Sequence, residues 1–246
     1  MTETSTPSGA TSVPAQGLLS RFIGIITSPK ATFQAVVAHP KWLWMFLLTT
    51  LIVACCTSFP MFTEWGRQAA LDQQVHQMES FGMKVDEAQY ARMEQGMSFA
   101  AYTTFFGVMI VSPIFALIIS GILFVVFNAI MGGSSTFKQL FAVVVHAGVI
   151  SALAQLFTAP LNYMAGSMSG KTNLAVLLPM LDENSFAGSL LGTIDLFMVW
   201  YVIVLAIGLG VLYKRRTQPI ALALFAFYAV IAVCIALVKS SFGGSN

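Results

Sequence analysis

The chain has 246 residues, of which 57% are hydrophobic and only 9% are charged. Soluble globular domains carry about 25% charged residues, so a soluble fold of this length could not cover so much apolar surface with polar groups. The formal net charge of +2 is too small to indicate nucleic-acid binding, and long basic tracts are absent from the sequence. These properties predict an all-α, polytopic membrane protein with the lipid bilayer as its solvent.

The N-terminal part precedes the first long apolar stretch. Residues 1–16 are rich in Ser, Thr, Pro and Ala and have no basic stretch followed by an apolar one, so we expect a disordered tail and not a secretory signal. Residues 17–40 are apolar and sparsely charged, with Ser28-Pro29 near their middle. We interpret them as an amphipathic interfacial helix that is broken at Ser28-Pro29.

Long charge-free stretches predict a bundle of five transmembrane helices, since one span needs about 20 mostly apolar residues. The predicted spans are 42–62, 106–131, 139–162, 190–213 and 218–238. The stretch between Glu94 and Lys138 is too long for one span, so its first part is expected to extend outside the bilayer. Pro113 is expected to kink the second span or, alternatively, to break it into two half-helices.

Two segments outside these spans have their own patterns. Residues 64–95 contain most of the acidic residues and predict two short polar helices separated by Gly82, forming an extracytoplasmic helical loop. Asp86 and Gln89 resemble the start of a capping box for the second helix. Residues 165–189 include the apolar stretch NLAVLLPML, which is too short to span and is expected to be interfacial or re-entrant.

The distribution of cations predicts the orientation through the positive-inside rule. A cytoplasmic N-terminus leaves seven cations inside against five outside, and three of the seven crowd the loop 214–216. The inner set is Arg21, Lys30, Lys41, Lys138, Lys214, Arg215 and Arg216. Five spans then place the C-terminus outside. If the source is a bacterium, the membrane is expected to be the inner membrane.

Motifs for catalysis or cofactor binding are absent from the sequence. It has no HExxH, GxSxG or P-loop, and its three cysteines lie in apolar runs without metal-ligand spacing. We therefore predict a protein that is not an enzyme, with no cofactor, no metal and no nucleic-acid partner.

Polar residues inside predicted spans are the candidate functional residues, because each is costly in lipid. They are Asn128, His146, Gln155 and Asp195. One interpretation is a proton relay between His146 and Asp195. The other makes Asp195 a helix-start residue near the outer interface and the remaining three interhelical hydrogen-bonding groups.

Small and polar residues share one face of the third span at Gly148, Ser151 and Gln155. Small residues allow close helix approach, either within the chain or in a dimer. Oligomeric state is left open.

Three segments carry a family resemblance. GIITSPKATFQAVVAHPKW, MGGSSTFKQLFAVVVHAGVI and GTIDLFMVWYVIVLAIGLG resemble the N-terminal segment, the third helix and the fourth helix of bacterial Yip1-domain proteins. The resemblance implies a five-helix membrane domain, here 17–240, with a cytoplasmic N-terminus. Eukaryotic Yip1-type proteins bind Rab-type GTPases, but their Asp-Leu-Tyr-Gly-Pro signature is absent here, so that activity is not expected.

Two functional hypotheses follow. The first is a non-enzymatic membrane protein of the Yip1-domain type that organises the membrane or partner proteins, whose identity the sequence does not give. The alternative is a small-solute or ion transporter or channel that uses the four intramembrane polar residues. Convergence of the four on one cavity would favour transport, and dispersal would favour packing.

Overall fold

The computed structural model describes residues 16–166, 172–178, 180–181 and 185–242. The predicted tail, apart from its last residue, lies outside the described residues. The helices in chain order are α1 (Leu18–Thr27), α2 (Pro29–Ala38), α3 (Leu43–Ser58), η1 (Phe59–Phe62), α4 (Glu64–Ser80), α5 (Glu87–Gly96), η2 (Met97–Phe99), α6 (Ala100–Phe124), η3 (Val125–Ile130), α7 (Phe137–Ala147), α8 (Val149–Ala165), η4 (Leu174–Leu177), α9 (Phe186–Thr193), α10 (Leu196–Leu212) and α11 (Thr217–Phe242). The predicted all-α class is confirmed: within the described ranges the one β-type contact is an isolated bridge.

Four helical stretches of the described chain are long and apolar enough to cross a bilayer. They are Leu43–Phe62, Glu87–Ile130, Phe137–Met164 and Thr217–Ser241. These stretches correspond to the first, second, third and fifth predicted spans and include them apart from residues 42 and 131. Pro113 does not break the second span into two half-helices, since α6 runs through it and continues into the π-helix η3.

The fourth predicted span, 190–213, is not one helix. α9 ends at Thr193, and the 17-residue α10 begins at Leu196. At 1.5 Å per residue α10 is about 25 Å long, slightly less than the roughly 30 Å hydrocarbon core. The apolar pattern runs through the break, so periodicity alone did not reveal it.

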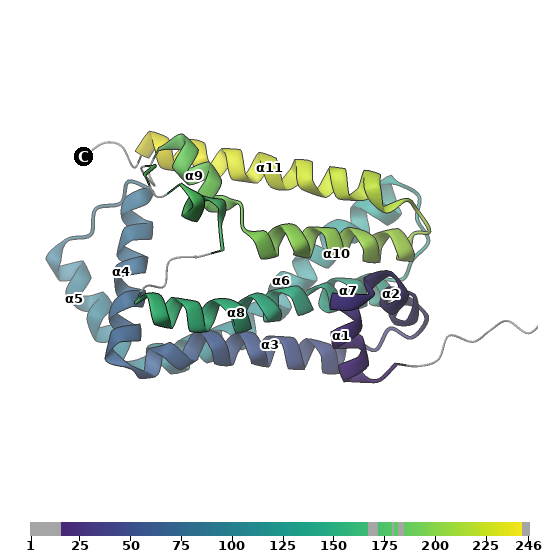
Figure 1. The fold of residues 1–246 in the computed structure, drawn as a ribbon, viewed down its shortest axis with the longest axis horizontal. Coiled ribbons are helices and arrows are strands. Elements are labelled where there is room, and N and C mark those ends of the chain that lie inside the picture. The colour runs from purple at the N-terminus through teal and green to yellow at the C-terminus, as the bar shows by residue number, and fades with distance from the viewer. Residues whose placement is uncertain (1–15, 167–171, 179, 182–184, 243–246) are drawn as a thin grey trace, which may run out of the picture.

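The long helices lie side by side, with α10 and α11 as an antiparallel pair on one side and α3 and α8 on the other (Figure 1). α7 packs between α2, α6 and α10, and each of its residues from Leu140 to Ala147 is buried. In the most apolar part of Phe137–Met164, 61% of the residues are buried inside the protein. The corresponding share is 17% in Glu87–Ile130 and in Thr217–Ser241. α7 and the first turn of α8 are therefore the most buried part of the bundle.

The N-terminal segment forms two helices with the predicted break at Ser28-Pro29, where Pro29 is the first residue of α2. Both pack into the bundle: Ile25 and Phe33 are fully buried members of the main hydrophobic core. Leu19 and Ile23 on α1 remain exposed. The sequence predicted an interfacial helix on the membrane surface, whereas one face of α2 is buried in the core of the bundle.

Gly208 of α10 makes room for this packing. A Cβ atom there would lie 2.6 Å from Val143 Cγ1 of α7 and 3.0 Å from Phe33 Cε1 of α2. Within the chain, Ser151 makes no close helix approach because it is exposed, and the atoms nearest to a Cβ at Gly148 belong to Val144 and Val145 in its own turn. A dimer contact through this face stays a prediction. Gly24 of α1 provides a second close approach, since a Cβ there would clash with Thr32 Oγ1 of α2.

The polar segment 64–95 forms two helices as predicted, α4 and α5, separated by Gly82 with φ 77°. The side chain of Asp86 accepts a 2.7 Å hydrogen bond from the Gln89 amide, which confirms the expected helix start. α4 crosses the ends of α3 and α8, and α5 projects beyond it (Figure 1). This hairpin therefore caps one end of the bundle.

We predict that Gly208→Leu lowers the free energy of unfolding by about 1–3 kcal/mol, because added side-chain atoms overpack the contact with Val143 and Phe33. Thermal melting in detergent measures the loss. Gly121→Leu on α6 is the matched control, since a Cβ there meets no atom within 4 Å. Equal melting temperatures for the two variants would contradict the packing role of Gly208.

Candidate functional site

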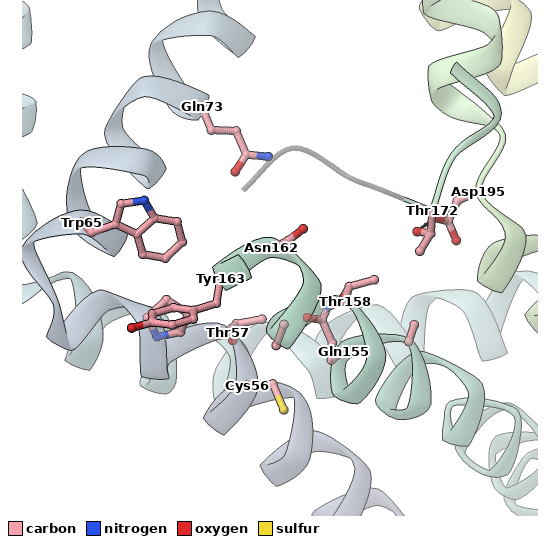
Figure 2. A pocket seen from close by; sticks show the side chains of 13 residues that line it. Cys56, Thr57, Trp65, Gln73, Gln155, Thr158, Asn162, Tyr163, Thr172 and Asp195 are labelled. Atoms are coloured by element: carbon pink, nitrogen blue, oxygen red, sulfur yellow. Dashed lines mark hydrogen bonds between the residues drawn. The ribbon is translucent and has the colours of Figure 1, made fainter. Parts of the chain in front are cut away.

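A polar cavity of about 440 Å³ lies beside the capping helix α4, between α3, α8 and the start of α10 (Figure 2). Cys56 of α3, Trp65 and Gln73 of α4, and Asp195 at the start of α10 all line it. Segments that are far apart in the chain thus line the same cavity. Its lining combines amide, hydroxyl, thiol, aromatic and carboxyl groups.

α8 supplies one wall of the cavity, with the polar side chains of Gln155, Thr158 and Asn162. Their spacing of three and four residues places them on one helix face. The Oδ1 atom of Asn162 is buried without a hydrogen-bond donor in the structure. Since buried polar atoms are usually paired, a water molecule or a polar ligand group in the cavity would satisfy it.

The opposite wall is built where the α9–α10 helix is interrupted. The Leu174 amide donates to the Ile194 carbonyl at 3.0 Å, and the Leu196 amide donates to the Thr172 carbonyl at 3.1 Å. These two bonds hold the segment before η4 against the break, as an antiparallel bridge between Asn173 and Asp195. Backbone groups exposed by the interruption are thereby paired.

Asp195 is the N-cap of α10. Its Oδ1 accepts hydrogen bonds from the amides of Phe197, at 2.8 Å, and Met198, at 3.0 Å, while the Thr172 hydroxyl donates to Oδ2. The interpretation of Asp195 as a helix-start residue is confirmed. Both carboxyl oxygens already have donors, so their first role is to close the helix end.

Asn128 lies in a different place, at the other end of the bundle. Its Nδ2 donates to the Ser135 carbonyl at 2.7 Å, and its Oδ1 accepts from the Tyr213 hydroxyl at 2.7 Å. The Ser135 hydroxyl lies 2.8 Å from that of Tyr213. A Cβ at Gly133 would lie 2.6 Å from the Tyr213 ring, so the glycine-rich turn accommodates this ring. Asn128 therefore links the end of α6 to α10, as interhelical hydrogen bonding requires.

His146 is fully buried in α7 and separate from both groups. Its Nδ1 lies 2.7 Å from the Ala142 carbonyl of the same helix. A carbonyl only accepts, so Nδ1 carries the hydrogen and Nε2 presents a lone pair. Nε2 is buried without a partner in the structure, and no hydrogen bond connects it to Asp195. The structure does not bring the two ends of the proposed relay together.

Comparison with known proteins identifies the family. The family model of the Yip1 domain matches residues 23–238. The chain belongs to the Yip1 domain family. A relative of this Yip1 domain protein, membrane protein YknW of Bacillus subtilis (strain 168), is 25% identical over 232 residues, which are 89% of this chain and 91% of YknW. No solved structure matches the chain. The resemblance noted in the sequence is confirmed, and the protein is an integral membrane protein.

Of the four polar residues singled out in the sequence, only Gln155 and Asp195 share the cavity of this Yip1 domain protein. Sequence reasoning missed Asn162, Thr158 and Thr172. The first two could have been found from their helical spacing with Gln155. Thr172 could not, because its place beside Asp195 depends on a long-range backbone pairing.

We predict that Cys56 reacts with a small, charged, membrane-impermeant thiol reagent, because it lines the polar cavity. Cys55 is exposed on the same helix but does not line the cavity, and we expect it to face acyl chains. The Cys55→Ala/Cys234→Ala variant isolates Cys56, and Cys56→Ala/Cys234→Ala isolates Cys55 as the control. Rates of modification in sealed vesicles should be higher for Cys56; an equal or lower rate would show that water does not fill the cavity.

Proposed function

We propose that five helices of this Yip1 domain protein cross the bilayer: the four long stretches and, in addition, α10. The N-terminus then lies in the cytoplasm and the C-terminus outside. Two observations support it. α10 pairs with α11 along the bundle, and its length of about 25 Å comes close to that of the hydrocarbon core. The segments expected inside also gather seven cations at one end, as the positive-inside rule requires. The exposed Leu19 and Ile23 of α1 then lie at the inner interface, as an amphipathic helix would.

We infer further that the protein is a non-enzymatic organiser of other membrane polypeptides. The observation that carries this proposal is the dispersal of the intramembrane polar groups. Asn128 is hydrogen-bonded at one end, His146 is enclosed in the core, and Gln155 and Asp195 lie by the capping helix. Groups that are separated in this way favour packing and local capping over a continuous path for ions.

The α4–α5 hairpin is the element best suited to bind a partner. α5 has no buried residue, and its contact with α4 includes a 3.0 Å hydrogen bond from Gln68 to the Tyr90 hydroxyl. The hairpin also carries the acidic side chains of Glu64, Asp72, Glu79, Asp86, Glu87 and Glu94. Since packing within the chain does not explain α5, we assign it to contact with a partner that has an extracytoplasmic polar surface.

We predict that a photoreactive residue at Ala91 of α5 yields a discrete crosslink to the same membrane or exported protein in replicate native-membrane samples. Leu222 of α11, 66% exposed and apolar, is the control and should crosslink to lipid only. Crosslinked products are identified by mass spectrometry. No reproducible protein adduct from Ala91, or the same adducts from both positions, would contradict the proposal.

The second candidate is a small-solute transporter, favoured by one observation: Gln155 and Asp195 share the polar cavity with the unpaired Asn162 carbonyl oxygen. A cavity of about 440 Å³ suits an amino-acid-sized polar solute. The walls from α8 and α10 belong to different helix pairs, as an alternating-access site requires.

Flux into liposomes distinguishes this candidate. If it holds, Gln155→Leu should reduce uptake of a small polar solute severalfold, because the variant removes hydrogen-bonding groups from the cavity wall. Ser151→Leu, on the exposed part of the same helix, is the control. Solute fluxes that are unchanged by Gln155→Leu, or absent for the unsubstituted protein, would exclude transport and leave the organising role as the proposal.

A further inference from the structure

A second hollow, of about 830 Å³, lies at the opposite end of the bundle from the capping helix. It is formed by one face of α2, by Gln139 at the start of α7, and by the turn that joins α10 to α11. Figure 1 shows α2 and this turn at the same end of the molecule. The hollow therefore lies where two long apolar helices end and polar surroundings begin.

Four cations line this hollow. They are Lys30, Lys214, Arg215 and Arg216. The described acidic residues lie either in the α4–α5 hairpin, with Asp86 just before α5, or at Asp195, at the far end of α10. α10 is about 25 Å long, which exceeds the screening length of about 8–10 Å at physiological salt. None of the described acids can neutralise the four cations, so the hollow has a positive potential.

The basic turn is held in a defined shape. The Arg215 amide donates a 2.9 Å hydrogen bond to the Gly210 carbonyl, and Lys214 has a positive φ of 52°. A Cβ at Gly210 would lie 2.9 Å from Thr217 Oγ1 and 3.1 Å from the Arg215 carbonyl oxygen, so a larger residue there would crowd the turn. Topology alone requires cations on one side of the membrane. It does not require a tightly closed turn around a hollow.

α2 is fixed against the same hollow. The Gln139 side chain donates a 3.3 Å hydrogen bond to the Val37 carbonyl, and Arg215 donates a 2.9 Å hydrogen bond to the Met131 carbonyl. One edge of the Arg215 guanidinium is thereby engaged. Lys30 and Arg216 are exposed and have no acidic partner among the described residues. Their charged groups are available to a ligand.

We propose that this hollow binds the phosphate of an anionic phospholipid headgroup. Lysine and arginine are the side chains that bind phosphate, and basic pockets between membrane helices at the interface suit lipid headgroups. The lining also includes Val37, Ala38 and Val211, which offer apolar contact to the glycerol and upper acyl region. A free phosphate ion would use the same cations but would gain nothing from this apolar part.

The test uses the full-length protein in a neutral detergent and native mass spectrometry. The probes are short-chain phosphatidylglycerol, phosphatidylcholine of the same chain length, and inorganic phosphate. We expect phosphatidylglycerol to bind more tightly than either of the others. Phosphatidylcholine that binds as tightly would remove the role of net charge, and inorganic phosphate that binds as tightly would identify the free ion as the ligand; either result overturns the proposal.

Matched variants locate the site. Lys30→Gln/Arg216→Gln should weaken the apparent affinity for phosphatidylglycerol about tenfold, because it removes two cations from the hollow. Lys41→Gln/Lys138→Gln removes the same charge from the same end but from positions that do not line the hollow, and should change the affinity less than about twofold. Equal weakening by both pairs would show diffuse attraction only and would overturn the proposal.

A charge-preserving variant separates loss of binding from loss of fold. Lys30→Arg/Arg216→Lys should bind phosphatidylglycerol as the unsubstituted protein does. If this variant also loses the lipid, charge in the hollow is not the cause, and the proposal fails.

Discussion

A helix that stops leaves backbone amides and carbonyls without partners, and in a membrane protein most of these partners must come from the chain itself. This constraint explains the architecture around α10. The break between α9 and α10 leaves amides and carbonyls that Thr172, Leu174 and the Asp195 carboxylate pair. The segment that provides these groups is thereby held on the side of the polar cavity that faces α8. The polar cavity lies between this paired segment and α8.

The bundle is built outward from α7. Its buried residues contact α2, α6 and α10, and the missing side chain of Gly208 lets Phe33 reach the centre. The N-terminal helices are thus part of the core and not an appendage. At the same end, the Asn128–Ser135–Tyr213 hydrogen bonds hold the glycine-rich turn on α10. The described acidic groups lie toward the capping end of this framework, whereas seven of the cations lie toward the other end, so the two ends differ in charge.

Local sequence signals predicted the parts of this structure that depend on neighbouring residues. Ser28-Pro29 marked a helix break, Asp86 a helix start and Asp195 another, because proline geometry and capping act over one turn. Uncharged stretches gave the long helices. The interruption before Asp195, the burial of α2 and the cavity could not be found in this way, since each depends on contacts between residues that are distant in the chain. Asn128 was recognised as polar and costly, but Tyr213 as its partner lies 85 residues away.

The contrast in burial between the α7–α8 segment and the outer helices has a consequence for how such sequences diverge. Where a helix faces acyl chains, any apolar side chain serves, so α6 and α11 constrain polarity but not shape. Where it is enclosed, as at Leu140 or Val143, volume and shape are both constrained. Neutral drift should therefore accumulate on the periphery, and relatives can keep the same arrangement of helices along their whole length while retaining few identical residues.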